Sequence, residues 1–270
     1  MTPEAGDSDS QLVISSRPAP GVIQIALNQP DRRNALTEAV AQALRRELAM
    51  VAADSSARTL VLTGAGPAFC AGADLGRLGA GADTPAAKRQ SLSDYYRAFL
   101  DLRDLAIPTI AAVNGPAIGA GLNLALCCDL RVVADDAQLV APFVKLGIHP
   151  GGGATWMLNR IVGPAGAREM LLLGLPVDAE RAFQLGLANR VVPAPHLQEA
   201  ALEWAVSLAS LPAPVIRKLK HTLAMAEAGE SLEAVLSFET EAQAEALASE
   251  DAREGWAALR EHRKPEFHDR

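Results

Sequence analysis

Short apolar runs bounded by proline and glycine mark the first two thirds of the chain. Residues 11–16 and 21–27 are two such runs, and the RPAPG between them predicts a β-hairpin. Further apolar runs at 58–64 and 109–113, and a pair of short ones within 130–142, have the length and composition of strands.

Helical periodicity fills the intervals between these runs. After Thr37, a capping residue, Val40, Leu44 and Leu48 recur at helical spacing, and residues 84–105 carry a similar pattern. Alternation of strands and helices predicts an α/β fold with right-handed crossovers.

The pattern changes after Val192, where strand signals stop. Residues 196–263 are helical in pattern, with breaks at LPAP and AGES. We therefore divide the chain into a flexible tail (1–10), a core (11–195) and a helical region (196–270). The apolar faces of that region need covering, which favours docking on a neighbouring subunit.

Composition narrows the protein class. Hydrophobic residues make up 49% and charged residues 21% of the 270 positions, with a net charge of −7, as expected for a globular protein without a nucleic-acid surface. No apolar run approaches the ~20 residues of a membrane span. The amino-terminal MTPEAGDSDS differs from a targeting peptide, so we expect a cytoplasmic protein without membrane contact.

The three cysteines, Cys70, Cys127 and Cys128, lie in tight apolar stretches without disulfide or metal-site spacing. A nucleophilic Cys70 is one interpretation. No histidine lies nearby in sequence to activate it, so small buried thiols are favoured.

Two glycine-rich loops carry the clearest chemical signal. AFCAGADL (68–75) and NGPAIGAGLN (114–123) each follow a predicted strand. Small residues there leave backbone amides free to bind an anion or a developing oxyanion. GAGPAF has Phe69 in place of the third glycine of a dinucleotide-binding turn, and neither a P-loop nor a GxSxG motif occurs.

The ordered set NALTEA, AFCAGADL, VNGPAIGAGLNLALCCDLRVVADDAQL, LGIHPGGG, GLANRVVP and REHRKPEF resembles the enoyl-CoA hydratase/isomerase family, the crotonase superfamily. The resemblance runs from about residue 11 to 270. It implies a spiral of ββα units, a helical region used to form homotrimers or dimers of trimers, and acyl-CoA thioester substrates. Coenzyme A enters as part of the substrate, with no separate cofactor and no metal.

The resemblance places the two oxyanion donors at the backbone amides of Ala73 and Ala120. Gly119 and Gly121 flank the second donor in the expected substrate pocket. The family's two catalytic glutamates fall at Asn123 and Phe143, neither of which can move a proton. Asn123 can still orient a water or a carbonyl, and Phe143 makes the pocket drier.

Replacement acids and bases are few. His149, beside the PGGG turn, is a candidate base, although it can equally cap that turn. Asp74 is expected to order its loop through backbone N–H bonds, and Asp129 to end a helix. The 84–105 helix adds Asp94, Tyr95 and Tyr96, which packing explains equally well.

Coenzyme A needs cations near its phosphates. Arg32 and Arg33 match an amino-terminal basic contact of the family, and the HRK at 262–264 lies near a carboxy-terminal one, where a lysine common at the His262 position is absent. Each of these basic side chains can equally be a solvated surface charge without a ligand. The expected coenzyme A contacts are Arg32, Arg33, Ala71, Gly72, Asp74 and Lys264.

Three hypotheses follow. The first is an acyl-CoA enzyme of this family with an unusual base or substrate. The second is an acyl-CoA carrier that kept the pocket without the chemistry, and the third is a structural trimer. Retained Gly72, Gly119 and Gly121 argue against the third, because an unused oxyanion hole needs no such loops.

Overall fold

The computed structural model describes residues 12–74 and 84–270, and a six-stranded sheet of order β1-β2-β3-β4-β6-β9 forms the centre of this part. β1 and β2 form the predicted antiparallel hairpin, and the other pairs are parallel. Its strands are β1 (Val13–Ala19), β2 (Val22–Leu27), β3 (Thr59–Gly64), β4 (Thr109–Val113), β6 (Leu130–Ala134) and β9 (Arg190–Val192).

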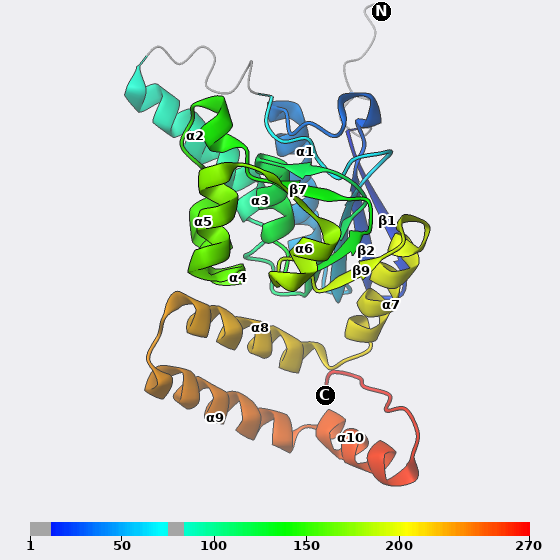
Figure 1. Cartoon of the computed structure of the whole chain (residues 1–270). Coiled ribbons are helices and arrows are strands. Elements are labelled where there is room, and N and C mark those ends of the chain that lie inside the picture. Colours follow the sequence, from blue (N-terminus) through cyan, green and yellow to red (C-terminus); the bar gives the residue numbers. More distant parts are fainter. Residues whose placement is uncertain (1–11, 75–83) are drawn as a thin grey trace, which may run out of the picture.

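A smaller sheet, ordered β5-β7-β8, lies beside the first (Figure 1). The chain moves between the two sheets as it advances, from β4 to β5, then to β6, β7 and β8. This α/β winding is the predicted spiral of ββα units. The strands of the smaller sheet are β5 (Ala117–Ile118), β7 (Gln138–Val140) and β8 (Pro176–Asp178).

Helices surround both sheets. α1 contacts β1 and β2, while α7 contacts β2, β3, β4 and β6. The helices are α1 (Glu38–Ala53), α2 (Pro85–Leu100), α3 (Ala120–Leu126), α4 (Ala154–Ile161), α5 (Gly163–Leu173), α6 (Ala179–Gln184), α7 (Leu197–Ala209), α8 (Ala213–Ala228), α9 (Leu232–Ala248) and α10 (Glu250–Glu261), with 3-10 turns η2 (Pro30–Arg32), η3 (Phe143–Leu146) and η4 (Ala194–His196).

Local chemistry sets the helix ends. The Thr37 side chain caps α1 by accepting from the Val40 amide, as predicted, and Thr84 caps α2 in the same way. α2 ends at Leu100 rather than at 105, because residues 101–104 turn toward β4. The tail predicted over 1–10 lies outside the described residues.

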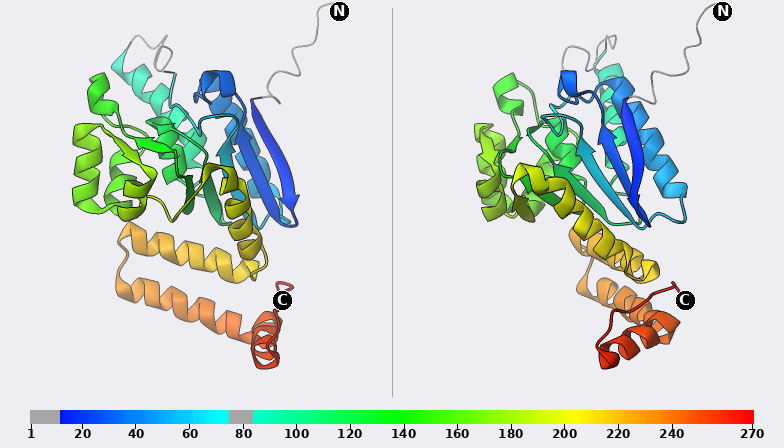
Figure 2. Two further views of the ribbon diagram at one scale, coloured as in Figure 1. Left: turned by 45° about the vertical axis from the view of Figure 1, so that its right-hand side comes forward. Right: turned by 90° about the vertical axis from the view of Figure 1, so that its right-hand side faces the viewer.

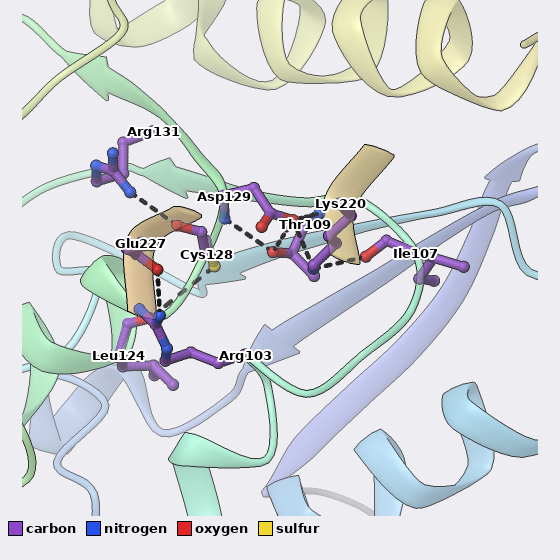
Figure 3. A network of polar contacts seen from close by, with 9 residues as sticks. All are labelled: Arg103, Ile107, Thr109, Leu124, Cys128, Asp129, Arg131, Lys220 and Glu227. Atoms are coloured by element: carbon purple, nitrogen blue, oxygen red, sulfur yellow. Dashed lines mark hydrogen bonds and ion pairs between the residues drawn. The ribbon is translucent and has the colours of Figure 1, made fainter. Parts of the chain in front are cut away.

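The last helices form a layer below the two-sheet core, with α8 nearest to it and α9 and α10 farther away (Figures 1 and 2). Polar contacts hold α8 on the core (Figure 3). Lys220 donates to the Ile107 carbonyl at 2.9 Å and to Asp129 at 2.7 Å, and Arg103 pairs with Glu227 at 2.6 Å.

Candidate active site

The two glycine-rich loops lie side by side and run parallel. Cys70 pairs with Ala117 in an isolated parallel bridge, in which the Cys70 amide donates to the Pro116 carbonyl and the Ile118 amide donates to the Cys70 carbonyl. Their distances are 3.2 and 3.0 Å. This pairing fixes the register between segments almost fifty residues apart.

Three residues beyond the bridge, the two segments reach Ala73 and Ala120. Glycines with positive φ precede both alanines, Gly72 at 93° and Gly119 at 56°. A Cβ added to Gly72 would lie 3.6 Å from the Ala120 nitrogen, so the turns are adjacent. Among the described residues, neither alanine amide has a hydrogen-bond acceptor. Two unpaired donors at adjacent turns are the geometry that an oxyanion hole requires.

Gly121 determines how closely the turns approach. It lies on α3, and a Cβ there would overlap the Cys70 carbonyl oxygen. Gly121 therefore packs α3 against the first loop. We predicted that Gly121 lines the substrate pocket, but it is not among the residues that line this cavity.

A cavity of about 80 Å³ opens beside the two amides. It brings together most of the residues that the sequence analysis selected, from both loops, α2, α3 and the turn after η3. Its polar and predicted lining residues are Ala71, Gly72, Ala73, Tyr95, Tyr96, Gly119, Ala120, Asn123, Phe143 and His149. Within this described lining there is no carboxylate.

His149 lies exposed at this cavity, and its Nδ1 is 2.7 Å from the Pro150 carbonyl oxygen. A carbonyl accepts, so Nδ1 carries the proton and Nε2 presents its lone pair. The bond to the turn thus orients the ring and leaves its second nitrogen able to accept a proton. Both interpretations of this histidine, turn contact and base, fit this one geometry.

Asn123 is 1% exposed and points from α3 toward the PGGG turn. Its Nδ2 donates to the Gly151 carbonyl at 2.8 Å, while its Oδ1 has no hydrogen-bond partner among the described residues. Reversing the amide would set two oxygens against each other, so the unpartnered atom is an acceptor. Phe143 is buried and gives the cavity an apolar wall.

Cys70 does not act as a nucleophile in this arrangement. Burial raises the pKa of its thiol to about 12, even though the Gly72 and Leu36 backbones hydrogen-bond to the sulfur. The favoured interpretation of small buried thiols holds for Cys127 and Cys128 too, because both are buried and burial raises the pKa of each.

Arg32 and Asp74, expected at coenzyme A, line a neighbouring cavity of about 910 Å³ and pair with each other at 3.1 Å. The Asp74 carboxylate accepts from the Arg32 side chain. The residues that follow it, 75–83, lie outside the described part of the chain, so its backbone N–H bonds stay a prediction. Arg33 is exposed, and its carbonyl accepts from the Ala71 amide at 2.9 Å.

Lys264 follows α10, at the far end of the molecule from the α2–α3 region (Figure 1). Nearby Arg263 pairs with Glu254 and Glu261. The structure therefore does not bring Lys264 to the candidate site within one chain.

Sequence reasoning missed one supporting side chain, Asn34, and left the roles of Tyr95 and Tyr96 open. Buried Asn34 donates to the Ala65 and Ala68 carbonyls and so holds the first loop. The Tyr95 hydroxyl donates to the Leu36 carbonyl at 2.9 Å, and Tyr96 lines the cavity. Asn34 follows QPDRR, a turn signal, but the two carbonyls to which it donates lie over thirty residues away and no local pattern identifies them.

Within the described ranges, no helix is both long and apolar enough to cross a membrane. Asp94 lines the neighbouring cavity rather than the smaller one. Asp129 accepts from the Thr109 backbone and hydroxyl and from Lys220. Its role is structural, but it joins β4 to α8 and does not end α3, whose C-cap is Cys127.

Comparison with known proteins gives a consistent result. A family model described as enoyl-CoA hydratase/isomerase matches residues 18–270. The probable enoyl-CoA hydratase EchA14 of Mycobacterium tuberculosis is 49% identical over 202 residues, which cover 75% of this chain and 77% of that protein. The 1,2-epoxyphenylacetyl-CoA isomerase of Escherichia coli is 37% identical over 249 residues, 92% of this chain and 95% of that protein.

Solved structures agree with this assignment. The enoyl-CoA hydratase of Bacillus anthracis superposes with a TM-score of 0.89 at 33% identity, covering 96% of this chain and 100% of that one. Sequence, fold and paired loops therefore identify this chain as a hydratase/isomerase-type enzyme that belongs to the enoyl-CoA hydratase/isomerase family.

Proposed function

We propose that the enzyme moves a proton along the acyl chain of an enoyl-CoA thioester, with double-bond migration as the net reaction. The observation that carries this proposal is that two amides and one oriented imidazole adjoin the same cavity. Among the described residues the amides have no acceptor and the cavity lining has no carboxylate. One base suffices for migration, since it can return the proton that it removed.

The proposed sequence balances without a co-reactant. Nε2 of His149 takes a proton from C2 of a 3-enoyl-CoA, and the electron pair moves onto the thioester oxygen. The amides of Ala73 and Ala120 hold that oxyanion, and each such donor contributes about 3 kcal/mol in known oxyanion holes. The same imidazolium then protonates C4, which gives the 2-enoyl-CoA.

Phe143 supports this chemistry by excluding bulk water from the cavity, which strengthens the electrostatic effect of the amides. Asn123 supplies a fixed hydrogen-bond acceptor in place of a proton mover. The alternative is a carrier that binds acyl-CoA without transforming it. It is favoured only by Asn123 and Phe143 at the positions of the family's glutamates, and His149 weakens that argument because it can serve as a base.

The test is deuterium incorporation from heavy water into 3-enoyl-CoA substrates, read by mass spectrometry. His149→Asn keeps a donor for the Pro150 carbonyl and removes the Nε2 position, so we expect the exchange rate to fall about 10²- to 10⁴-fold. Added imidazole should restore part of the rate in His149→Ala. The matched control is His196→Asn, at an exposed histidine in η4.

Unchanged exchange in His149→Asn would refute the assigned base. Retention of the thioester with no exchange in the wild type would instead support the carrier.

We further propose a homo-oligomer, trimer or dimer of trimers, built on the carboxy-terminal helices. Large apolar side chains there are more than half exposed, including Leu223, Leu232, Leu236 and Leu259. We also propose that coenzyme A enters as part of the substrate and that the enzyme uses no further cofactor. We propose a cytoplasmic location.

A further inference from the structure

The peptide bond that joins Gly72 to Ala73 is held through its carbonyl oxygen. The nitrogen of this peptide belongs to Ala73 and is the first proposed oxyanion donor. The oxygen belongs to Gly72, and it accepts from the Leu36 amide at 2.8 Å. Because a trans peptide is planar, its C=O and N–H point in opposite directions. The bond from Leu36 therefore fixes the direction of the Ala73 N–H, which is the property that a preorganised donor needs.

The 33–36 segment follows the first glycine-rich loop along its length. Leu36 pairs with Ala73 in an isolated parallel bridge. Two residues earlier in the loop, the Ala71 amide donates to the Arg33 carbonyl at 2.9 Å. A shift of the 33–36 segment would therefore move the first oxyanion donor relative to the second.

A side chain of α2 holds this segment in place. The Tyr95 hydroxyl donates to the Leu36 carbonyl at 2.9 Å, and Leu36 itself is fully buried. Edge-to-face contacts with Tyr96 and Phe99, at ring-centroid distances of 5.9 and 6.0 Å, fix the Tyr95 ring. Burial raises the pKa of Tyr95, which keeps its hydroxyl protonated and able to donate. Packing accounts for the ring, and the hydroxyl adds a directed bond to the backbone that holds the first donor.

The second donor is fixed by its own helix. The peptide that contains the Ala120 nitrogen begins at Gly119, whose carbonyl accepts from the Asn123 backbone amide at 3.0 Å in the first turn of α3. The Gly119 amide donates to the Val140 carbonyl of β7 at 2.9 Å. These contacts join main-chain atoms of secondary structure. The first donor differs because the segment that holds it is supported by the side chain of Tyr95.

We propose that Tyr95 is a positioning residue for the oxyanion hole, and that it directs the Ala73 amide through Leu36. The inference rests on the proposed oxyanion hole but not on the identity of the base. Without the hydroxyl, the buried Leu36 carbonyl loses a donor and its segment relaxes. The Ala73 amide then loses its fixed direction, so transition-state stabilisation falls while binding of the acyl-CoA persists.

The experiment compares Tyr95→Phe with the wild type in two readouts. The first is the infrared carbonyl frequency of bound butyryl-CoA labelled with ¹³C at the thioester carbonyl, because a hydrogen-bonded carbonyl absorbs at lower frequency. The wild-type complex should lie below the free ligand, and the Tyr95→Phe complex should lie between the two.

The second readout is proton exchange of a 3-enoyl-CoA. Removing an oxyanion-hole donor outright costs about 10²- to 10³-fold in kcat. A donor that is present but misdirected keeps part of its effect, so Tyr95→Phe should lower kcat about tenfold and leave KM within about twofold.

Thr222→Val is the matched control. The Thr222 hydroxyl also donates to a backbone carbonyl at 2.9 Å, that of Lys218, and Thr222 is buried in α8 and absent from the cavity lining. The variant loses a hydrogen bond of the same kind and should keep both readouts at wild-type values. Thermal unfolding of the three proteins sets an assay temperature at which all of them are folded.

Wild-type frequency and kcat in Tyr95→Phe would overturn the positioning role. A lower kcat with an unchanged frequency would also overturn it, because the effect would then arise elsewhere in the site. Equal losses in Tyr95→Phe and Thr222→Val would assign both to stability and overturn the role as well. Equal frequencies for free and wild-type-bound ligand would instead refute the oxyanion hole itself, and this inference with it.

Discussion

Gly121 is the position where one methyl group should test the proposed oxyanion hole. A Cβ there would lie 2.8 Å from the Cys70 carbonyl carbon and 2.8 Å from Cys70 Cβ, besides overlapping the carbonyl oxygen. Carbon atoms in good contact are about 3.5 Å apart. Backbone atoms cannot rotate away, so Gly121→Ala must push α3 and the first loop apart by about 0.7 Å or more.

This displacement separates the Ala73 and Ala120 amides, which are held in register by the Cys70–Ala117 bridge. A misplacement of about 1 Å can cost about 10²-fold in rate, and we expect a loss of that size. Overpacking costs about 1–3 kcal/mol in stability. The usual gain of about 0.5–1 kcal/mol for replacing a helical glycine by alanine offsets part of it.

Gly255→Ala is the matched control. Gly255 also lies in a helix, α10, and a Cβ there would meet Phe267 at an ordinary 3.7 Å. This variant should gain the full helical stabilisation and keep wild-type activity. Both proteins are assayed by chemical unfolding and by α-proton exchange of an enoyl-CoA. Wild-type exchange and stability in Gly121→Ala would refute the tight approach of the loops.

Two further predictions follow from the pKa values. Since burial raises the pKa of Cys70 and Cys127 to about 12, iodoacetamide at pH 8 should label no cysteine in the native protein and all of them after denaturation; rapid labelling of the folded protein would contradict their burial. Hydrogen bonds from Ser56 and Arg17 lower the pKa of Asp54 from an ordinary 3.8 to about 2. The stability that this carboxylate contributes is present above pH 4 and disappears as the pH falls through 2. Asp54→Asn should therefore reduce the slope of unfolding free energy against pH between 4 and 2, and an unchanged slope would exclude this contribution.

Much of the fold could be predicted because its signals are local. The Thr37 cap, the hairpin and the breaks at LPAP and AGES are each encoded within a few residues, and each is present in the structure. The division between α9 and α10 at Ser249 was not predicted, because Ser249 caps α10 within a continuous helical pattern.

The site was predictable only in part. The backbone donors follow from small residues in the loops, whereas side-chain direction depends on contacts between distant segments. Tyr95 and Tyr96 are adjacent in sequence, yet the Tyr95 hydroxyl is bonded to the Leu36 carbonyl, whereas the Tyr96 hydroxyl lies at the cavity without a partner among residues 12–74 and 84–270. The Arg32–Asp74 ion pair joins residues 42 positions apart, and no local pattern indicates it.

The parallel bridge between Cys70 and Ala117 makes the backbone part of this site independent of the side chains proposed to transfer protons. The proposed oxyanion hole consists of main-chain atoms positioned by strand register, so its geometry does not depend on which of those side chains face the cavity. The side chains that line the same cavity, at positions 96, 123, 143 and 149, lie on elements outside the bridge, and we propose that they determine proton transfer. Substitutions at those positions can change the reaction while the activation of the thioester persists, which makes this scaffold suited to acquiring new acyl-CoA chemistry by side-chain replacement alone.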